Sequence, residues 1–136
     1  MWLGSDLVAR DEQMLGNIGI THVVNCAADY SENYLFAKGV QYKSYHLKDH
    51  VREDISCVFY DAIDFIADAR RKGGKVYVHC VQGISRSATI ILAYKIFTEK
   101  ITYQEGYNYL KERRACINPN MTFIAQLVWF QKRLQE

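Results

Sequence analysis

The sequence predicts one α/β domain with three layers: a central mixed, mostly parallel sheet of about four or five strands, flanked by helices. Two observations predict this class. Short runs rich in β-branched residues alternate along the chain with longer segments in which apolar residues recur every three or four positions. The length of 136 residues fits a single domain, so the whole range 1–136 is assigned to it.

Four runs are expected to form the strands. Residues 21–26 (THVVNC) follow a glycine and are rich in β-branched side chains, which is typical of a buried strand. Residues 40–47 alternate between apolar and polar side chains, and residues 75–80 (KVYVHC) supply a third strand. Residues 2–4 are expected to form an edge strand. The chain starts abruptly inside this strand, which favours a piece cut from a longer protein.

One helix is expected before the strand at residues 21–26, and a second is expected after the strand at residues 40–47. Asp6 would cap a helix running to about Asn17. Asp54 would cap a second helix that ends at Gly73-Gly74. Its apolar residues fall on one face, at Ile55, Val58, Phe59, Ala62, Ile63 and Ile66.

Three more helices are expected after the third strand. Residues 87–97 are apolar on nearly all sides, which predicts a helix buried in the centre of the domain. Thr102 and Glu105 form a capping box for a helix that reaches about Ala115. The last helix follows Pro119-Asn120, and the residues expected to face inward are Phe123, Ile124, Leu127, Val128 and either Phe130 or Leu134.

Charge and cysteine content exclude several classes of protein. Seventeen basic and fifteen acidic residues leave a formal net charge of +2, which argues against a nucleic-acid partner. No apolar run approaches the ~20 residues of a membrane span. The four cysteines form no Cys-x-x-Cys pair, so neither a zinc site nor a secreted disulfide framework is expected. A cytoplasmic protein is favoured, with the nucleus as the alternative; a monomer is favoured, although no sequence feature determines the oligomeric state.

The informative segment is residues 79–87, His-Cys-Val-Gln-Gly-Ile-Ser-Arg-Ser, between the third strand run and the buried helix. A helix N-terminus offers unpaired N–H groups and the positive end of the helix dipole, which together bind an oxyanion. The amides of Val81, Gln82, Gly83, Ile84, Ser85 and Arg86 would form the nest, with Gly83 allowing the tight curl.

Within this ring, Cys80 and Arg86 carry the chemistry. A thiol at a helix N-terminus near an arginine has a lowered pKa and acts as a thiolate nucleophile. Arg86 can donate two parallel hydrogen bonds to phosphoryl oxygens. An isolated cysteine at a strand end is usually a buried apolar residue. However, five fixed residue types in nine positions should occur by chance in roughly one such chain in a hundred thousand.

The pattern His-Cys-x-x-Gly-x-x-Arg-Ser resembles the signature of the cysteine-based protein tyrosine phosphatases, and its form HCVQGISRSATIILAY resembles the small dual-specificity protein phosphatases. The resemblance extends over most of the chain: Leu3-Gly4-Ser5, residues 19–27 (GITHVVNCA), Gly73-Gly74-Lys75-Val76 and Ile117-Asn118-Pro119-Asn120. Gln82 departs from the family, which more often has a small residue there.

The resemblance implies a role for each residue of the loop. Cys80 would attack phosphorus, and Arg86 with the loop amides would stabilise the transition state. Ser87 would donate a hydrogen bond to the leaving thiolate; alternatively, it caps the following helix. His79 would tune the loop from behind rather than transfer a proton. No metal and no cofactor is implied.

A general acid must protonate the leaving oxygen. The family places an aspartate about thirty residues before the cysteine, which favours Asp49, 31 residues before Cys80. Asp54 is the alternative, although the expected role of Asp54 is to cap a helix.

The larger tyrosine-specific phosphatases of the superfamily add a loop that deepens the cleft, and this chain is too short for it. The resemblance therefore implies a shallower cleft, which would admit phosphoserine and phosphothreonine as well as phosphotyrosine on a protein substrate. The alternatives are a phosphoinositide, disfavoured by a loop without lysine, an RNA 5′ phosphate, and an inactive phosphate-binding scaffold. The basic clusters at residues 70–72 and 111–114 are interpreted as solvated surface, with a docking patch as the alternative. Cys26, Cys57 and Cys116 are expected to serve in core or surface packing, with a resolving thiol for an oxidised Cys80 as the alternative.

Overall fold

The computed structural model describes residues 1–136, and its centre is a four-stranded sheet in the order β1-β4-β2-β3. The strands are β1 (Trp2–Gly4), β2 (His22–Asn25), β3 (Gln41–Ser44) and β4 (Val76–His79). Every neighbouring pair is parallel. The predicted α/β class and all four strands are confirmed, but the sheet is parallel throughout rather than mixed. The one antiparallel contact is an isolated bridge between Ala27 and His46.

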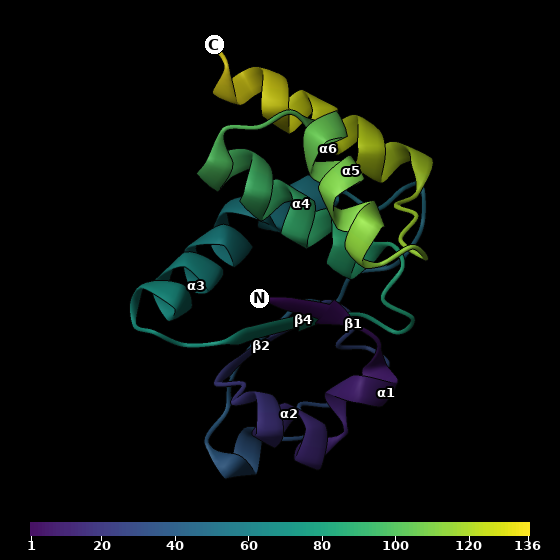
Figure 1. The fold of residues 1–136 in the computed structure, drawn as a ribbon. Helices are drawn as coiled ribbons and strands as arrows, with labels where there is room; N and C mark the ends of the chain where they lie inside the picture. Colours follow the sequence, from purple (N-terminus) through teal and green to yellow (C-terminus); the bar gives the residue numbers. More distant parts are fainter.

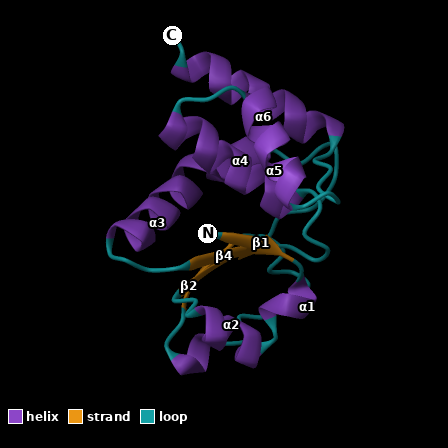
Figure 2. Cartoon of the chain, in the orientation of Figure 1, coloured by secondary structure: helices purple, strands orange, loops and turns teal.

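Helices cover both faces of the sheet, which gives the three predicted layers (Figures 1 and 2). One face carries the short helices α1 (Asp6–Ala9) and α2 (Glu12–Ile18). The other carries α3 (Phe59–Arg71), α4 (Arg86–Glu99), α5 (Tyr103–Arg113) and α6 (Met121–Leu134). Two 3₁₀ turns, η1 (Phe36–Lys38) and η2 (Ile55–Val58), precede β3 and α3. None of the helices is long and apolar enough to cross a membrane.

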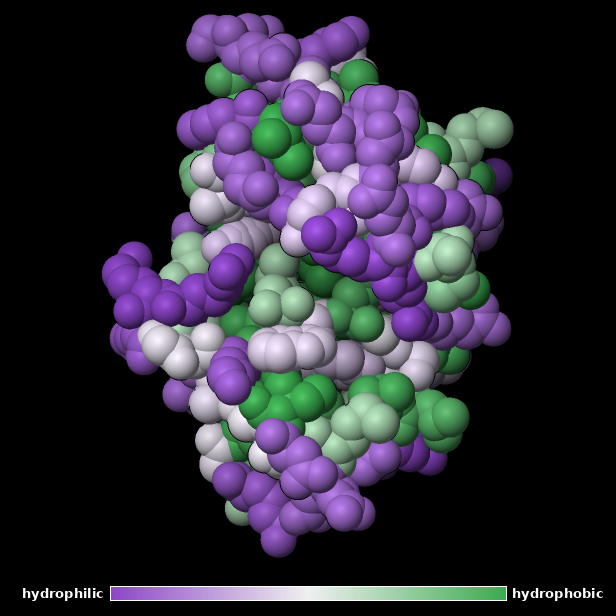
Figure 3. Space-filling view, in the orientation of Figure 1, coloured by the Kyte–Doolittle hydropathy of each residue, from purple (hydrophilic) through white to green (hydrophobic).

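The alternation of side chains along β4 divides the interior into two cores. Val76 and Val78 join the large core beneath α3, α4 and α6, and Cys80 continues that side beyond the strand. Tyr77 points to the other face and joins the smaller core beside α1 and α2. In Figure 3, hydrophobic side chains gather across the middle of the molecule, where the sheet lies, and hydrophilic ones cover the outer helices.

Local capping signals explain where the helices begin. Thr102 and Glu105 form the predicted capping box of α5, and the side chain of Asn120 accepts the amide of Phe123 at the start of α6. The single helix predicted over residues 6–17 is wrong. Ser5 caps α1 and Asp11 caps α2, so the chain breaks into two helices between them.

The remaining helices follow the predicted apolar faces. α4 begins at Arg86 and is buried for most of its length, as its apolar sequence predicts. On α6, Phe123, Leu127 and Phe130 are buried, and Ile124, Val128 and Leu134 are partly buried against the same core. Asp54 does precede η2, but its side chain accepts from the Ser56 hydroxyl instead of capping a backbone amide.

Candidate active site

The segment 80–85 leaves the carboxyl end of β4 in the interior of the sheet and enters the N-terminus of α4. Gly83 has a φ of +70°, in the left-handed region that the tight curl requires. A Cβ at Gly83 would lie 2.6 Å from the carbonyl oxygen of Gly4, so the loop also needs glycine for space. The predicted permissive position is therefore confirmed.

The Cys80 thiol is buried at the base of this loop, with its Sγ 3.2 Å from the Ser87 Oγ. Burial alone would raise the pKa of Cys80. That effect is outweighed by hydrogen bonds from the Ser87 hydroxyl and from the amides of Ser87 and Gly83, together with the charge of Arg86, so the pKa of Cys80 is lowered. The site therefore favours a thiolate. Ser87 lies inside the first turn of α4 and is not its cap.

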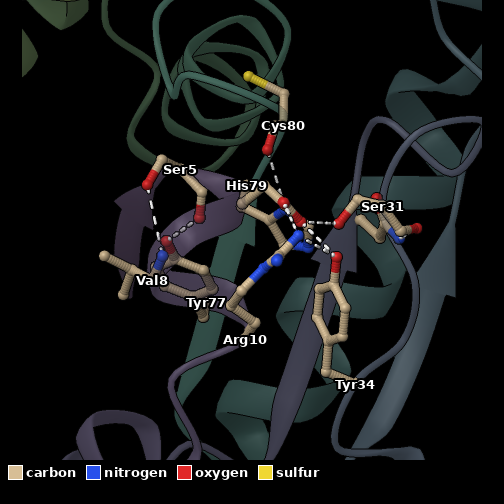
Figure 4. Close-up of polar contacts among 10 residues, drawn as sticks. Ser5, Val8, Arg10, Ser31, Tyr34, Tyr77, His79 and Cys80 are labelled. Atoms are coloured by element: carbon tan, nitrogen blue, oxygen red, sulfur yellow. Dashed lines mark hydrogen bonds and ion pairs between the residues drawn. The ribbon is translucent and has the colours of Figure 1, made fainter.

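His79 lies on the opposite side of the strand from the thiol. Figure 4 shows the Cys80 sulfur pointing toward the helical layer and the His79 ring pointing back among polar side chains. The His79 Nδ1 donates to the carbonyl of Cys80 at 3.1 Å, and the ring stacks on Tyr77. Burial lowers the pKa of His79, so the ring stays neutral at pH 7. The ring contacts the start of the loop from the opposite side, and it does not line the cleft that contains Cys80.

Arg86 is the first residue of α4, and its charge helps to lower the pKa of Cys80. Its side chain is buried, and its Nη1 donates to the carbonyl of Leu47 at 3.0 Å. Its Nε is buried and has no partner in the protein. A buried cationic donor without a partner is costly unless an anion completes it, so the Nε is available to donate to an oxyanion.

Asp49 lies in the turn that follows Leu47, and its carboxylate accepts a hydrogen bond from Asn120 Nδ2 at 3.0 Å. Lys48 N donates to Glu53 Oε1 at 2.7 Å, which closes the base of this turn. Both bonds restrain the turn, and Asp49 lines the same cleft as Cys80.

The cleft has a volume of about 340 Å³. Its lining is Tyr30, Asp49, Cys80, Val81, Gln82, Ile84, Ser85 and Arg86. Asp54 is not among these residues, so the structure brings Asp49 and not Asp54 to the thiol. A larger hollow of about 730 Å³ lies between β1, α4 and α5, but it contains no cysteine, and the chemistry lies in the smaller one.

Sequence reasoning did not single out three groups that the structure places at the site. Tyr30 lies exposed at the rim of the cleft. Asn120 was expected only to begin a helix, yet it also contacts Asp49. Arg114 was interpreted as solvated surface, and this is wrong: it is partly buried and bonds the carbonyls of Gln82 and Gly83. No local pattern marks these residues, because each meets the loop only in the folded chain.

The other cysteines are all free. Cys26 is buried next to the end of β2, and Cys57 and Cys116 are exposed. Nowhere in the molecule do three or more His, Cys, Asp or Glu side chains gather closely enough to hold a metal ion.

Comparison with known proteins adds the family. The sequence pattern described as "Dual specificity phosphatase, catalytic domain" matches residues 1–133. The chain is 41% identical over 134 residues to the human dual specificity protein phosphatase 1, and 38% identical over 134 residues to the protein-tyrosine-phosphatase MKP1 of Arabidopsis thaliana. Both alignments cover 98% of this chain, and it spans 36% and 17% of the length of these two relatives.

Solved structures agree with the sequence comparison. The human tyrosine phosphatase-like serine/threonine/tyrosine-interacting protein superposes with a TM-score of 0.92 at 32% identity. Human DUSP28 superposes with a TM-score of 0.93 at 28% identity, and each alignment covers 98% of this chain and 92% of the other. With the loop, the thiol and the arginine in place, the chain belongs to the family of dual specificity phosphatase catalytic domains.

Proposed function

We propose that this domain hydrolyses phosphate monoesters on tyrosine and on serine or threonine of proteins, through a cysteinyl-phosphate intermediate. The observation that carries the proposal is the cleft itself, in which the Cys80 thiol, the Arg86 guanidinium and the Asp49 carboxyl line one space of about 340 Å³. The printed names of the relatives, dual specificity protein phosphatase and protein-tyrosine-phosphatase, support the same activity.

In the first step the Cys80 thiolate attacks phosphorus, and the bond from phosphorus to the ester oxygen breaks. Asp49 gives its proton to the leaving oxygen. Arg86 and the inward-facing loop amides stabilise the charge on the equatorial oxygens of the transition state.

In the second step a water molecule attacks the phosphorus of the intermediate and the S–P bond breaks. The Asp49 carboxylate, left ionised by the first step, accepts the proton of the water. Ser87, 3.2 Å from the sulfur, stabilises the thiolate as it leaves. Inorganic phosphate departs and the starting state is restored.

A protein substrate is favoured over a multiply phosphorylated lipid head group. The residues that follow the thiol around the cleft, Val81, Gln82 and Ile84, carry no charge. They supply no cation for a second phosphate. The two carbon-rich side chains at the rim, Tyr30 and Val81, are exposed and can pack against the residue that carries the phosphate.

The test is phosphate release from matched peptides that differ only in carrying phosphotyrosine, phosphothreonine or phosphoserine, in a buffer with a metal chelator. We expect turnover of all three and none by Cys80→Ser, which should still bind the peptides. A phosphoinositide head group and a 5′-triphosphorylated RNA are run alongside. Faster turnover of either would replace the protein substrate, and peptide binding without turnover by the wild type would favour a scaffold.

A nucleophilic thiolate has to remain reduced to act, so we propose the cytoplasm or nucleus as the working compartment. Four free cysteines support this. Fractionation of cells that express the full-length protein tests it. Action as a monomer, without nucleic acid, stays a prediction.

A further inference from the structure

The carbonyl groups of the phosphate loop are all held from outside the cleft. Four of them are held by backbone groups or by a neighbour in sequence. These are Cys80 O by His79 Nδ1, Val81 O by the amide of Asp6, Ile84 O by the amide of Asn118, and Ser85 O by Thr89. The two carbonyls in the middle of the loop have no such donor.

Both middle carbonyls are held by one side chain. Arg114, at the end of α5, donates from Nε to the carbonyl of Gly83 at 2.9 Å and from Nη2 to the carbonyl of Gln82 at 3.0 Å. The planar guanidinium presents two donors in fixed directions, which suits two carbonyls on consecutive residues. A lysine at the same place would supply a point charge without this geometry.

The direction of a carbonyl sets the direction of the next amide, because the C=O and N–H of one trans peptide point in opposite directions. With the carbonyls of Gln82 and Gly83 drawn outward, the amides of Gly83 and Ile84 face inward. The Gly83 amide is one of the groups that hydrogen-bond the Cys80 sulfur. Gly83 is also the residue with the most conformational freedom in the loop, at a φ of +70°. The peptide units around it are therefore the ones that most need an external restraint.

We propose that Arg114 is a positioning residue of the phosphate loop: its two-pronged grip on Gln82 and Gly83 keeps their peptide units turned so that the following amides face the thiolate and the phosphoryl oxygens. The proposal rests on the proposed function of the loop as a phosphate site. It adds a residue 34 positions from the nucleophile that touches neither the substrate nor the reacting atoms.

The test compares Arg114→Met with Arg113→Met. Arg113 is the neighbouring arginine, carries the same charge, and packs on Tyr109 without contacting the loop. The readouts are kcat and KM for para-nitrophenyl phosphate, the acid limb of the pH profile of kcat/KM, and inhibition by orthovanadate. Complete removal of one oxyanion donor costs about 10²–10³ in rate, and we expect a displaced donor to cost about tenfold.

For Arg114→Met we expect about a tenfold lower kcat/KM, about tenfold weaker inhibition by vanadate, and an acid limb at higher pH. The last follows because a thiolate with one fewer amide donor gains its proton more readily. Arg113→Met should match the wild type. Arg114→Lys, which retains the positive charge, should recover only part of the loss because a lysine cannot hold both carbonyls.

Three results would overturn the proposal. The first is Arg114→Met behaving like Arg113→Met in all readouts. The second is a lowered melting temperature with unchanged vanadate inhibition and acid limb, which would leave Arg114 a purely structural role. The third is full activity of Arg114→Lys, which would show that a positive charge at position 114 is sufficient without the two-pronged hydrogen bonding. If the wild type neither turns over substrate nor binds vanadate, the proposed function fails instead. If the wild type is inactive but binds vanadate, vanadate binding still allows Arg114→Met to be compared with Arg113→Met.

Discussion

The side-chain amide of Asn120 donates a hydrogen bond to the carboxylate of Asp49, with 3.0 Å between Nδ2 and Oδ1, across 71 positions of sequence. The same residue donates its backbone amide to Ser85 Oγ and caps α6 through its Oδ1. Asn120 therefore joins the turn of the proposed acid, the phosphate loop and the helical layer. It orients the carboxyl group that has to reach the leaving oxygen.

Replacement of Asn120 by aspartate should separate capping from orientation. Aspartate caps a helix as well as asparagine does, so the melting temperature should change little. The new carboxylate cannot donate to Asp49 and repels it, so the acid loses its orientation and kcat should fall about tenfold for phosphate esters of poorly acidic alcohols. Asn118→Asp adds the same charge nearby and should leave kcat unchanged; an equal loss of kcat in both variants would contradict orientation by Asn120.

Asp49→Asn should remove the proton donor. For phosphate esters of poorly acidic alcohols we expect kcat to fall on the order of 10²–10⁴, and less for para-nitrophenyl phosphate, whose leaving group needs little protonation. Rates across a series of leaving groups measure this. Asp54→Asn is the matched control because Asp54 bonds the Ser56 hydroxyl outside the cleft. A greater loss from Asp54→Asn would move the acid role to Asp54.

Ser87→Ala should alter both steps of the reaction. The hydroxyl of Ser87 lowers the pKa of Cys80, so its loss should raise that pKa and move the acid limb of kcat/KM to higher pH. The thiolate would also leave the intermediate more slowly, so a burst of the first product should precede slow turnover. Stopped-flow assays over a pH series detect both effects. Ser56→Ala, which deletes a hydroxyl far from the thiol, should show neither the shifted acid limb nor the burst. If Ser87→Ala also shows neither effect, Ser87 does not stabilise the Cys80 thiolate.

Asp6 should make stability depend on pH. Its carboxylate accepts hydrogen bonds from Ser31, Tyr34 and Arg10. Partial burial would raise the pKa of Asp6, but these hydrogen bonds outweigh it and the pKa is lowered from its ordinary 3.8.

A carboxylate with a depressed folded-state pKa stabilises the fold above about pH 4, and this contribution is lost as the pH falls through the folded value. Asp6→Asn should therefore lower the free energy of unfolding by about 1–2 kcal/mol at pH 7, with the difference from the wild type shrinking toward pH 2. Urea unfolding at several pH values measures it. Asp64→Asn, at an exposed residue, serves as the control. A difference that does not depend on pH would contradict the linkage.

Peroxide should inactivate the domain reversibly. Oxidation of the Cys80 thiolate by peroxide gives a sulfenic acid and hydroxide. Cys26 continues β2 as Cys80 continues β4, and Asn25 and His79, the residues just before them, are paired in the sheet. Cys26 and Cys80 both belong to the large hydrophobic core.

Condensation of the Cys80 sulfenic acid with the Cys26 thiol would form a disulfide and release water. We expect mass spectrometry to find the Cys26–Cys80 pair after mild peroxide treatment and a thiol reductant to restore activity. Cys26→Ala should lose much of the recovery, whereas Cys57→Ser and Cys116→Ser, at exposed cysteines, should keep it. Equal recovery in all three variants would exclude Cys26.

Local patterns in the sequence predicted most of the fold. The strand runs, the capping box at Thr102 and the buried helix that follows the loop all depend on side chains a few positions apart, and the structure confirms them. The sequence does not predict the break between α1 and α2, because it offers Asp6 as the cap of one helix, whereas the structure uses Ser5 and Asp11 as the caps of two. The sequence predicts a mixed sheet, whereas every strand pair is parallel. Periodicity shows that a strand is half-buried without showing which neighbour it pairs with.

By itself the sequence determined the loop and its chemistry. Cys80, Gly83, Arg86 and Ser87 lie within eight consecutive residues at a junction from strand to helix, so the backbone alone brings the thiol, the amides and the cation together. The tertiary structure decided which aspartate faces the thiol and what holds the loop in shape. Asp49, Arg114 and Asn120 come from segments far apart in the sequence that meet only when the helical layer packs on the sheet, and contacts of that range leave no local pattern along the chain.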